Sequence, residues 1–177
     1  TYFGGVNYFN PEYEIYTRYS YSSYEKKGLS NPVVGRTIED RDGNLWIGTE
    51  GGGLNYYNRR TREFKWYRPQ EGRNSISHNN VKALYYDADK EIIWIGTHLG
   101  GLNKLDIRSG HFTHYRMEEG NPNTLPSDII RDIIPYKSLL IIATQNGVCL
   151  FDPANGQCQQ LFKDSKEGKS IKMVADV

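Results

Sequence analysis

Short apolar segments alternate along the chain with polar turns that are rich in glycine. Between residues 33 and 68 this pattern predicts four strands, at 33–40, 45–49, 53–58 and 63–68. Asp42-Gly43 is a strong hairpin signal between the first two strands, and Gly51-Gly52 separates the second from the third. These strands, their turns and one longer loop leave no room for a helix of several turns.

The same pattern returns at a fixed period. Matching phrases begin at Thr1, Thr49, Thr97 and Thr144, at spacings of 48, 48 and 47 residues. Three of them end in Gly-Gly followed by Val or Leu and then Asn, as in Thr97-His-Leu-Gly-Gly-Leu-Asn103. A fixed period of this size indicates an array of supersecondary units. We therefore interpret residues 1–177 as one partial array, whose units begin near these four threonines and whose last unit is incomplete.

A four-stranded antiparallel unit that repeats about every 48 residues predicts the blades of a β-propeller. The first strand of each unit would be innermost and the fourth would form the outer edge. The rival architecture is a parallel β-solenoid, which usually has a shorter period and does not need the Asp42-Gly43 hairpin. We expect an all-β fold, with these blades forming part of a ring. Because an open arc exposes apolar sheet faces, we expect further blades of a longer protein, or a second copy of the chain, to cover them.

Bulky apolar residues recur at the same positions in successive units, so we expect them to form the core. Trp46 and Trp94 are predicted to pack between neighbouring sheets. The other repeated aromatic positions are Phe64, Phe112, Tyr67 and Tyr115. Cys158 falls at the position of Phe64 and Phe112, where it would pack as a small apolar group.

The composition agrees with a β-rich fold and narrows the range of partners. Aromatic residues make up 13% of the chain, 14 of them Tyr, which suits half-buried strands. The 18 Gly suit the turns that join such strands. The 22 basic and 21 acidic residues are interspersed, so no basic stripe indicates nucleic acid. No apolar run is long enough to span a bilayer, and we expect no direct membrane insertion by this segment.

Several phrases carry a resemblance to a known family. Ile38-Glu-Asp-Arg-Asp-Gly-Asn-Leu-Trp-Ile-Gly-Thr49 and Ile93-Trp-Ile-Gly-Thr97, each followed by Gly-Gly-Leu-Asn, resemble the two-component regulator propeller repeat, and so does the link at 74–81. The resemblance implies a seven-bladed parent propeller. It also implies the periplasmic sensor region of a hybrid two-component regulator, in which a sensor histidine kinase is joined to a response regulator, in glycan-degrading gut bacteria. Leu140-Ile-Ile-Ala-Thr144 replaces the Trp-Ile-Gly pattern, so we expect the last units to differ in shape.

This resemblance implies a ligand-sensing segment that is not itself an enzyme and that recognises a glycan-derived oligosaccharide or another small ligand. Propellers gather the loops between second and third strands on one face, where ligands usually enter. The candidates there are Tyr2, Phe3, Glu50, His98, Gln145 and Asn146. The loops at 20–30, 69–79 and 117–128 share this face, and aromatic planes beside polar groups suit sugar rings. We expect no cofactor and no metal.

Other chemistry-bearing residues favour structural roles. Residues 40–44 superficially resemble a calcium loop, but no bidentate Glu follows, and a hairpin turn is the better interpretation. His111 and His114 lie three positions apart, so on a strand they would point to opposite faces. Cys149 and Cys158 flank a turn at 152–156, where a diagonal disulfide is conceivable in an oxidising periplasm, although free thiols are expected.

Two other functions remain open at this point. A lyase or hydrolase resembling the streptogramin lyases would need convergent His and Glu groups with a metal, and Glu50 and His98 are the only loop residues of that kind. The segment could also be a structural or dimerisation segment that binds no ligand.

Overall fold

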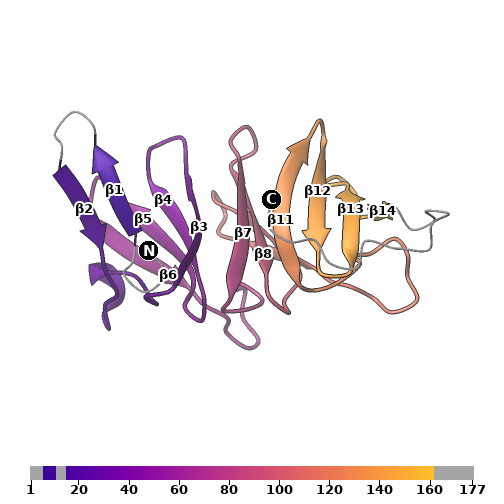
Figure 1. Ribbon diagram of the computed structural model, residues 1–177, viewed down its shortest axis with the longest axis horizontal. Coiled ribbons are helices and arrows are strands. Elements are labelled where there is room, and N and C mark those ends of the chain that lie inside the picture. Colours follow the sequence, from indigo (N-terminus) through magenta and orange to yellow (C-terminus); the bar gives the residue numbers. More distant parts are fainter. Residues whose placement is uncertain (1–5, 11–14, 162–177) are drawn as a thin grey trace. The chain divides into compact units, whose positions relative to one another are not determined.

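The computed structural model describes residues 6–10 and 15–161 of the chain (Figure 1). The chain divides into two compact units, Thr1–Val81 and Lys82–Val177, which are described separately below. Apart from one 3-10 helix, η1 (Glu25–Lys27), all elements of the described ranges are strands. The predicted all-β fold is therefore confirmed. None of the helices within these ranges is long and apolar enough to cross a membrane.

Unit 1 contains an antiparallel strand pair and one complete four-stranded sheet. The pair is β1 (Val6–Asn10) and β2 (Ile15–Tyr19). The sheet is β3 (Val34–Glu39), β4 (Leu45–Thr49), β5 (Gly53–Asn58) and β6 (Glu63–Tyr67), in that spatial order and antiparallel throughout. The predicted strand order is confirmed. β3 lacks one predicted residue at each end, and β6 lacks the last predicted residue.

Unit 2 contains two four-stranded sheets. The first is β7 (Val81–Asp87), which begins one residue before the unit, with β8 (Ile92–Thr97), β9 (Leu102–Asp106) and β10 (Phe112–Tyr115). The second is β11 (Ile130–Tyr136), β12 (Leu139–Thr144), β13 (Gly147–Phe151) and β14 (Cys158–Gln160). The second sheet keeps the strand order of the others despite its divergent sequence, but its β12–β13 turn is one residue shorter.

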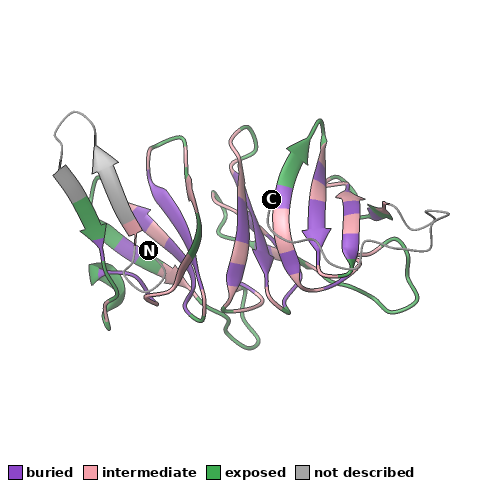
Figure 2. Ribbon diagram, in the orientation of Figure 1, coloured by how far each residue is buried: buried purple, intermediate pink, exposed green. Residues whose placement is uncertain are grey.

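The core of unit 2 lies between its two sheets, where β8 packs against β11. Every residue of β8 is buried, as Figure 2 shows. The Trp94 side chain is 1% exposed, and its ring lies 6.0 Å from that of Tyr115 in its own sheet and 5.4 Å from that of Phe151 in the other. Trp94 thus fills the space between the two sheets.

The core of unit 1 lies between the β1–β2 pair and the sheet that follows it. Its buried members are Tyr19, Leu29, Leu45, Ile47, Tyr57 and Phe64. Trp46 is 2% exposed, and its ring lies 4.6 Å from Tyr56 and 5.7 Å from Tyr67. The pairing of Trp46 with Tyr67 corresponds to that of Trp94 with Tyr115, so the two sheets that have a tryptophan in their second strand use it alike.

The glycine of the repeated Trp-Ile-Gly-Thr phrase allows neighbouring segments to approach closely. A Cβ on Gly96 would lie 2.5 Å from Ile130 Cγ2 and 3.0 Å from the Ala83 Cβ. A Cβ on Gly48 would lie 2.7 Å from Val81 Cγ1. No side chain fits at either place without movement, so the glycines let the next inner strand pack directly on the backbone.

The threonine and asparagine of the repeat satisfy buried polar groups. The Thr97 hydroxyl donates to the carbonyl of Gly101 at 2.9 Å, closing the β8–β9 turn. In unit 1, Asn55 Oδ1 accepts the backbone N–H of Ser30 at 2.8 Å, and its amide donates to Ser30 Oγ at 2.8 Å. Asn55 thereby ties the segment that precedes β3 to the middle of the sheet.

Residues 40–44 form a hairpin turn. Asp40 Oδ1 accepts the backbone N–H groups of Asp42 and Asn44 at 3.0 Å and 2.9 Å, and Trp46 Nε1 donates to Asp40 Oδ2 at 3.0 Å. Gly43 has a positive φ of 77°, which favours glycine there. The Asp40 carboxylate is therefore used by the turn and by the buried tryptophan.

Cys149 and Cys158 are buried, free thiols. They lie diagonally on β13 and β14, since Cys158 is opposite Phe151 and Cys149 is opposite Gln160. The Cys149 thiol donates to Cys158 Sγ at 3.2 Å. This hydrogen bond, together with burial and the neighbouring thiol, raises the pKa of Cys149 above its ordinary value.

Gly96→Ala is expected to lower the free energy of unfolding by about 1–3 kcal/mol, because the added methyl overpacks the contact with Ile130. Denaturant unfolding of the two proteins measures the difference. Ala143 occupies the equivalent position in β12, so Ala143→Gly is the reverse change and should cost about 0.5–1 kcal/mol, mainly through backbone entropy. Equal unfolding midpoints for Gly96→Ala and the wild type would show that the close approach is not required.

The unfolding free energy is expected to fall as the pH rises above the ordinary thiol pKa of about 8.5. The folded state holds the Cys149 proton more tightly than the unfolded state, so its contribution is complete below that pH and is lost above it. The expected slope is about 1.4 kcal/mol per pH unit. Cys149→Ala should flatten this decline in denaturant unfolding under reducing conditions. A thiol titration of the wild type should find both thiols only after unfolding, and an unchanged slope in the variant would contradict the assignment.

Candidate functional site

The turns between second and third strands hold most of the residues that the sequence selects. Tyr2 and Phe3 lie outside the described residues. Glu50 follows β4 in unit 1 and is half-buried. His98 follows β8 in unit 2, and Gln145 and Asn146 form the β12–β13 turn of the same unit. Unit 2 therefore contains three of the predicted residues, and its geometry can be described directly.

The backbone of Ile129 joins His98 and Gln145. His98 forms an antiparallel bridge with Ile129, and the backbone N–H of Gln145 donates to the Ile129 carbonyl at 2.9 Å. Ile129 comes directly before β11, so the segment that links the two sheets passes between both turns. Asn146 is exposed at the tip of its turn, and its N–H donates to Thr144 Oγ1 at 3.3 Å.

Arg131 belongs to this group, although the sequence did not single it out. Its Nη2 donates to Gln145 Oε1 at 3.4 Å. Ile130 pairs with Thr144 and Asp132 pairs with Ala143, so Arg131 is the extra residue of a β-bulge. Bulges redirect a side chain and are frequent beside functional sites. The signal available in the sequence was a charged pair, Arg131-Asp132, inside an otherwise apolar inner strand.

The group contains two buried nitrogen atoms that have no hydrogen-bond partner among the described residues. They are His98 Nδ1 and Arg131 Nε. Buried polar atoms in proteins are almost always paired, so an unpaired one requires a specific explanation. Here one unpaired atom belongs to the residue whose backbone bridges to Ile129, and the other to the residue two positions after Ile129.

One repeated side-chain contact positions the segments that lead into the inner strands. The side chains of Asn31, His78 and Ser127 each accept the backbone N–H two residues further on, at 2.8, 3.1 and 3.1 Å. These local bonds favour a turn just before β3, β7 and β11. His78 therefore has a structural role, and Ser127 fixes the approach to Ile129.

The loop at 20–30 packs on the outer strand of its unit. Trp66 Nε1 donates to the Gly28 carbonyl at 2.9 Å, and Glu25 Oε1 accepts the Trp66 N–H at 2.7 Å. Its two tyrosines, Tyr21 and Tyr24, are 54% and 69% exposed. This loop is thus held against β6 by hydrogen bonds to Trp66.

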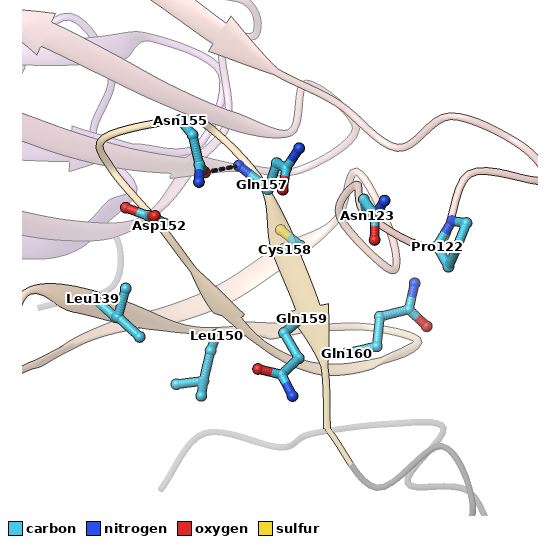
Figure 3. A pocket seen from close by; sticks show the side chains of 10 residues that line it. All are labelled: Pro122, Asn123, Leu139, Leu150, Asp152, Asn155, Gln157, Cys158, Gln159 and Gln160. Atoms are coloured by element: carbon cyan, nitrogen blue, oxygen red, sulfur yellow. Dashed lines mark hydrogen bonds between the residues drawn. The ribbon is translucent and has the colours of Figure 1, made fainter.

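A cavity of about 460 Å³ lies at the outer edge of the second sheet of unit 2 (Figure 3). It is lined by Pro122, Asn123, Leu139, Leu150, Asp152, Asn155, Gln157, Cys158, Gln159 and Gln160. Leu139, Leu150 and Gln159 lie on one side of the sheet in Figure 3, with Gln159 directly opposite Leu150 in register. The cavity offers many amide groups, and Pro122 and Asn123 belong to the predicted loop at 117–128, but it contains none of the six candidate ligand-binding residues.

The described residues offer little for metal or nucleophilic chemistry. His111 and His114 are both exposed at β10. No group of three or more His, Cys, Asp or Glu side chains within 6–10 and 15–161 could hold a metal ion. Glu50 and His98 belong to different units, so the structure establishes no pairing between them.

Two stretches of the chain, residues 28–51 and 75–98, match the family described as two component regulator propeller. Each stretch runs from the segment before an inner strand to the turn after the second strand. They therefore include the glycine and threonine whose contacts are described above. No curated protein matches the chain.

Solved propeller structures match the chain closely in fold. The extracellular domain of a putative hybrid two component system from B. thetaiotaomicron has 24% identity and a TM-score of 0.76, over 91% of this chain and 22% of that one. The extracellular domain of a putative one component system from the same organism has 24% identity and a TM-score of 0.69, and the match covers 90% of this chain and 22% of that one. A streptogramin B lyase has 11% identity and a TM-score of 0.62, and the match covers 89% of this chain and 47% of the lyase.

The chain thus spans about a fifth of the two extracellular domains that it matches. Likeness at these identities shows the fold, and the two repeat matches show the kind of blade. Its sheets are blades of a β-propeller, and residues 28–51 and 75–98 match the two-component regulator propeller family.

Proposed function

We propose that this chain is a ligand-sensing segment in the extracytoplasmic part of a two-component regulator, and that it recognises an oligosaccharide. The family of its repeats and the fold shared with extracellular domains of such systems support the proposal. The observation that carries it is the meeting of His98, Gln145 and Arg131 around Ile129. The proposal assigns binding to this chain and histidine kinase activity to other parts of the protein.

The chemistry of this group suits a hydroxyl-rich ligand. Arg131 supplies several N–H donors, Gln145 can donate and accept, and the His98 imidazole can do either according to its proton. Leu99, in the same turn as His98, is 55% exposed and adds apolar surface. A few polar groups beside apolar surface are typical of small-molecule sites.

Binding at this place would affect both sheets of unit 2. His98 belongs to the β8–β9 turn and Gln145 to the β12–β13 turn, so a ligand that contacts both favours one arrangement of the two sheets. A ligand shifts a conformational equilibrium only by its difference in affinity for the two states. A ligand that contacts both sheets binds more tightly to the arrangement in which both contacts form, which gives the required difference in affinity.

The full-length protein is expected to bind one of a panel of polysaccharide-derived oligosaccharides in calorimetric titration. Gln145→Ala should weaken that binding by about 0.5–1.5 kcal/mol, the usual net value of one hydrogen bond. Gln159→Ala makes the same change on β14, at the cavity of Figure 3, and should leave the affinity unchanged.

The reverse result, with Gln159 required and Gln145 dispensable, would move the site to that cavity. Absence of binding to every sugar of the panel would contradict the proposed function.

A further inference from the structure

Arg131 carries a positive charge that no carboxylate neutralises within the described part of the chain. Its side chain donates a hydrogen bond from Nη2 to Gln145 Oε1 at 3.4 Å. The two acidic residues nearest in sequence are engaged elsewhere. Asp128 Oδ2 lies 3.8 Å from Arg116 Nη1, and its Oδ1 accepts the Met117 N–H at 2.7 Å, while Asp132 Oδ1 accepts the Ile133 N–H at 2.9 Å.

The position of Arg131 makes this lack of an acidic partner costly. The residue is half-buried, and its Nε is fully buried without an acceptor. A guanidinium can remain charged in such a place, since its pKa is too high for it to lose the proton. Removing part of a charged group from water is unfavourable unless another group replaces the water. Because Arg131 is only half-buried, an acceptor from outside the chain would supply that replacement at the exposed part of its side chain.

Gln145 adds donors at the same place. It uses its Oε1 to accept from Arg131, so its Nε2 amide hydrogens are available to a ligand. His98 lies in the facing turn, where its backbone bridges to Ile129, and its buried Nδ1 has no partner among the described residues. Arg131 and Gln145 together therefore form a pair with more donors than acceptors.

We propose that Arg131, with Gln145 beside it, binds a carboxylate group of the ligand, so that the sensed molecule is an acidic oligosaccharide containing a uronate unit. The planar guanidinium fork matches the two oxygens of a carboxylate. The bulge at Arg131 redirects this one side chain, while Ile130 and Ile133 of the same strand are buried. This inference rests on the proposed function and adds the chemical class of the ligand.

The test compares three kinds of ligand on the full-length protein by calorimetric titration. They are uronate-containing oligosaccharides, the same oligosaccharides with their carboxyl groups reduced to alcohols, and monomeric organic acids. The acidic oligosaccharide should bind at least about tenfold more tightly than its reduced form, as expected for one charge-assisted hydrogen-bonded contact. Its affinity should also fall as the salt concentration rises.

Arg131→Gln should remove this preference, and Arg131→Lys should restore it only in part, because lysine keeps the charge but loses the bidentate geometry. Arg108→Gln is the matched control. It removes the same charge from the β9–β10 turn, at the opposite end of β9 from His98, where Arg108 pairs with Glu91. It should bind like the wild type. Thermal unfolding of each variant shows whether it is folded, and Arg131→Lys provides the test if Arg131→Gln is not.

Each outcome decides between the two proposals. If acidic and reduced oligosaccharides bind with equal affinity, and Arg131→Gln changes neither affinity, the carboxylate inference is overturned and sugar sensing is left intact. Binding of monomeric organic acids that depends on Arg131, without binding of any oligosaccharide, supports a carboxylate site but overturns sugar sensing. Binding of none of the three kinds of ligand overturns both proposals.

Discussion

The close approach of an inner strand to the glycine of the preceding sheet is the constraint on which the rest of the structure depends. Ile130 and Ala83 occupy the space that a side chain on Gly96 would need. Because β11 can lie directly on this backbone, Trp94 is enclosed between two sheets and the Ile129 segment reaches both turns. The core and the candidate site of unit 2 are therefore consequences of one packing contact.

Repetition within the chain made the blades predictable. The strands at 45–49 and 53–58 have the predicted bounds, because turn residues such as Gly43 and the alternation of apolar positions specify them locally. The four-stranded order was predictable for the same reason, since adjacent hairpins can only form a meander. The shape of the last sheet was harder to predict. Its missing tryptophan and shorter turn left the order unchanged, because Thr144 closes the turn on Gly147 at 2.8 Å as its counterparts do.

The candidate site was less predictable than the fold. His98 and Gln145 could be placed in equivalent turns from the repeat alone, but their common contact with Ile129 arises from the crossing of a segment between sheets. Arg131 could not be predicted as a site residue, because a bulge depends on how two strands pair, and the sequence of one strand does not show this pairing. Cys149 shows a similar limit. It replaces the asparagine that ties a connecting segment to the sheet elsewhere, and its contact with Cys158 depends on a diagonal pairing.

The β-bulge of β11 has a wider consequence for how such blades can diversify. Side chains alternate between the two faces of a strand, so an ordinary substitution must suit whichever face it occupies. The inserted residue at 131 lies outside this alternation, and Ile130 and Ile133 of the same strand are buried. Chemical specificity can therefore vary at one position while the hydrophobic pattern that builds the blade is inherited intact.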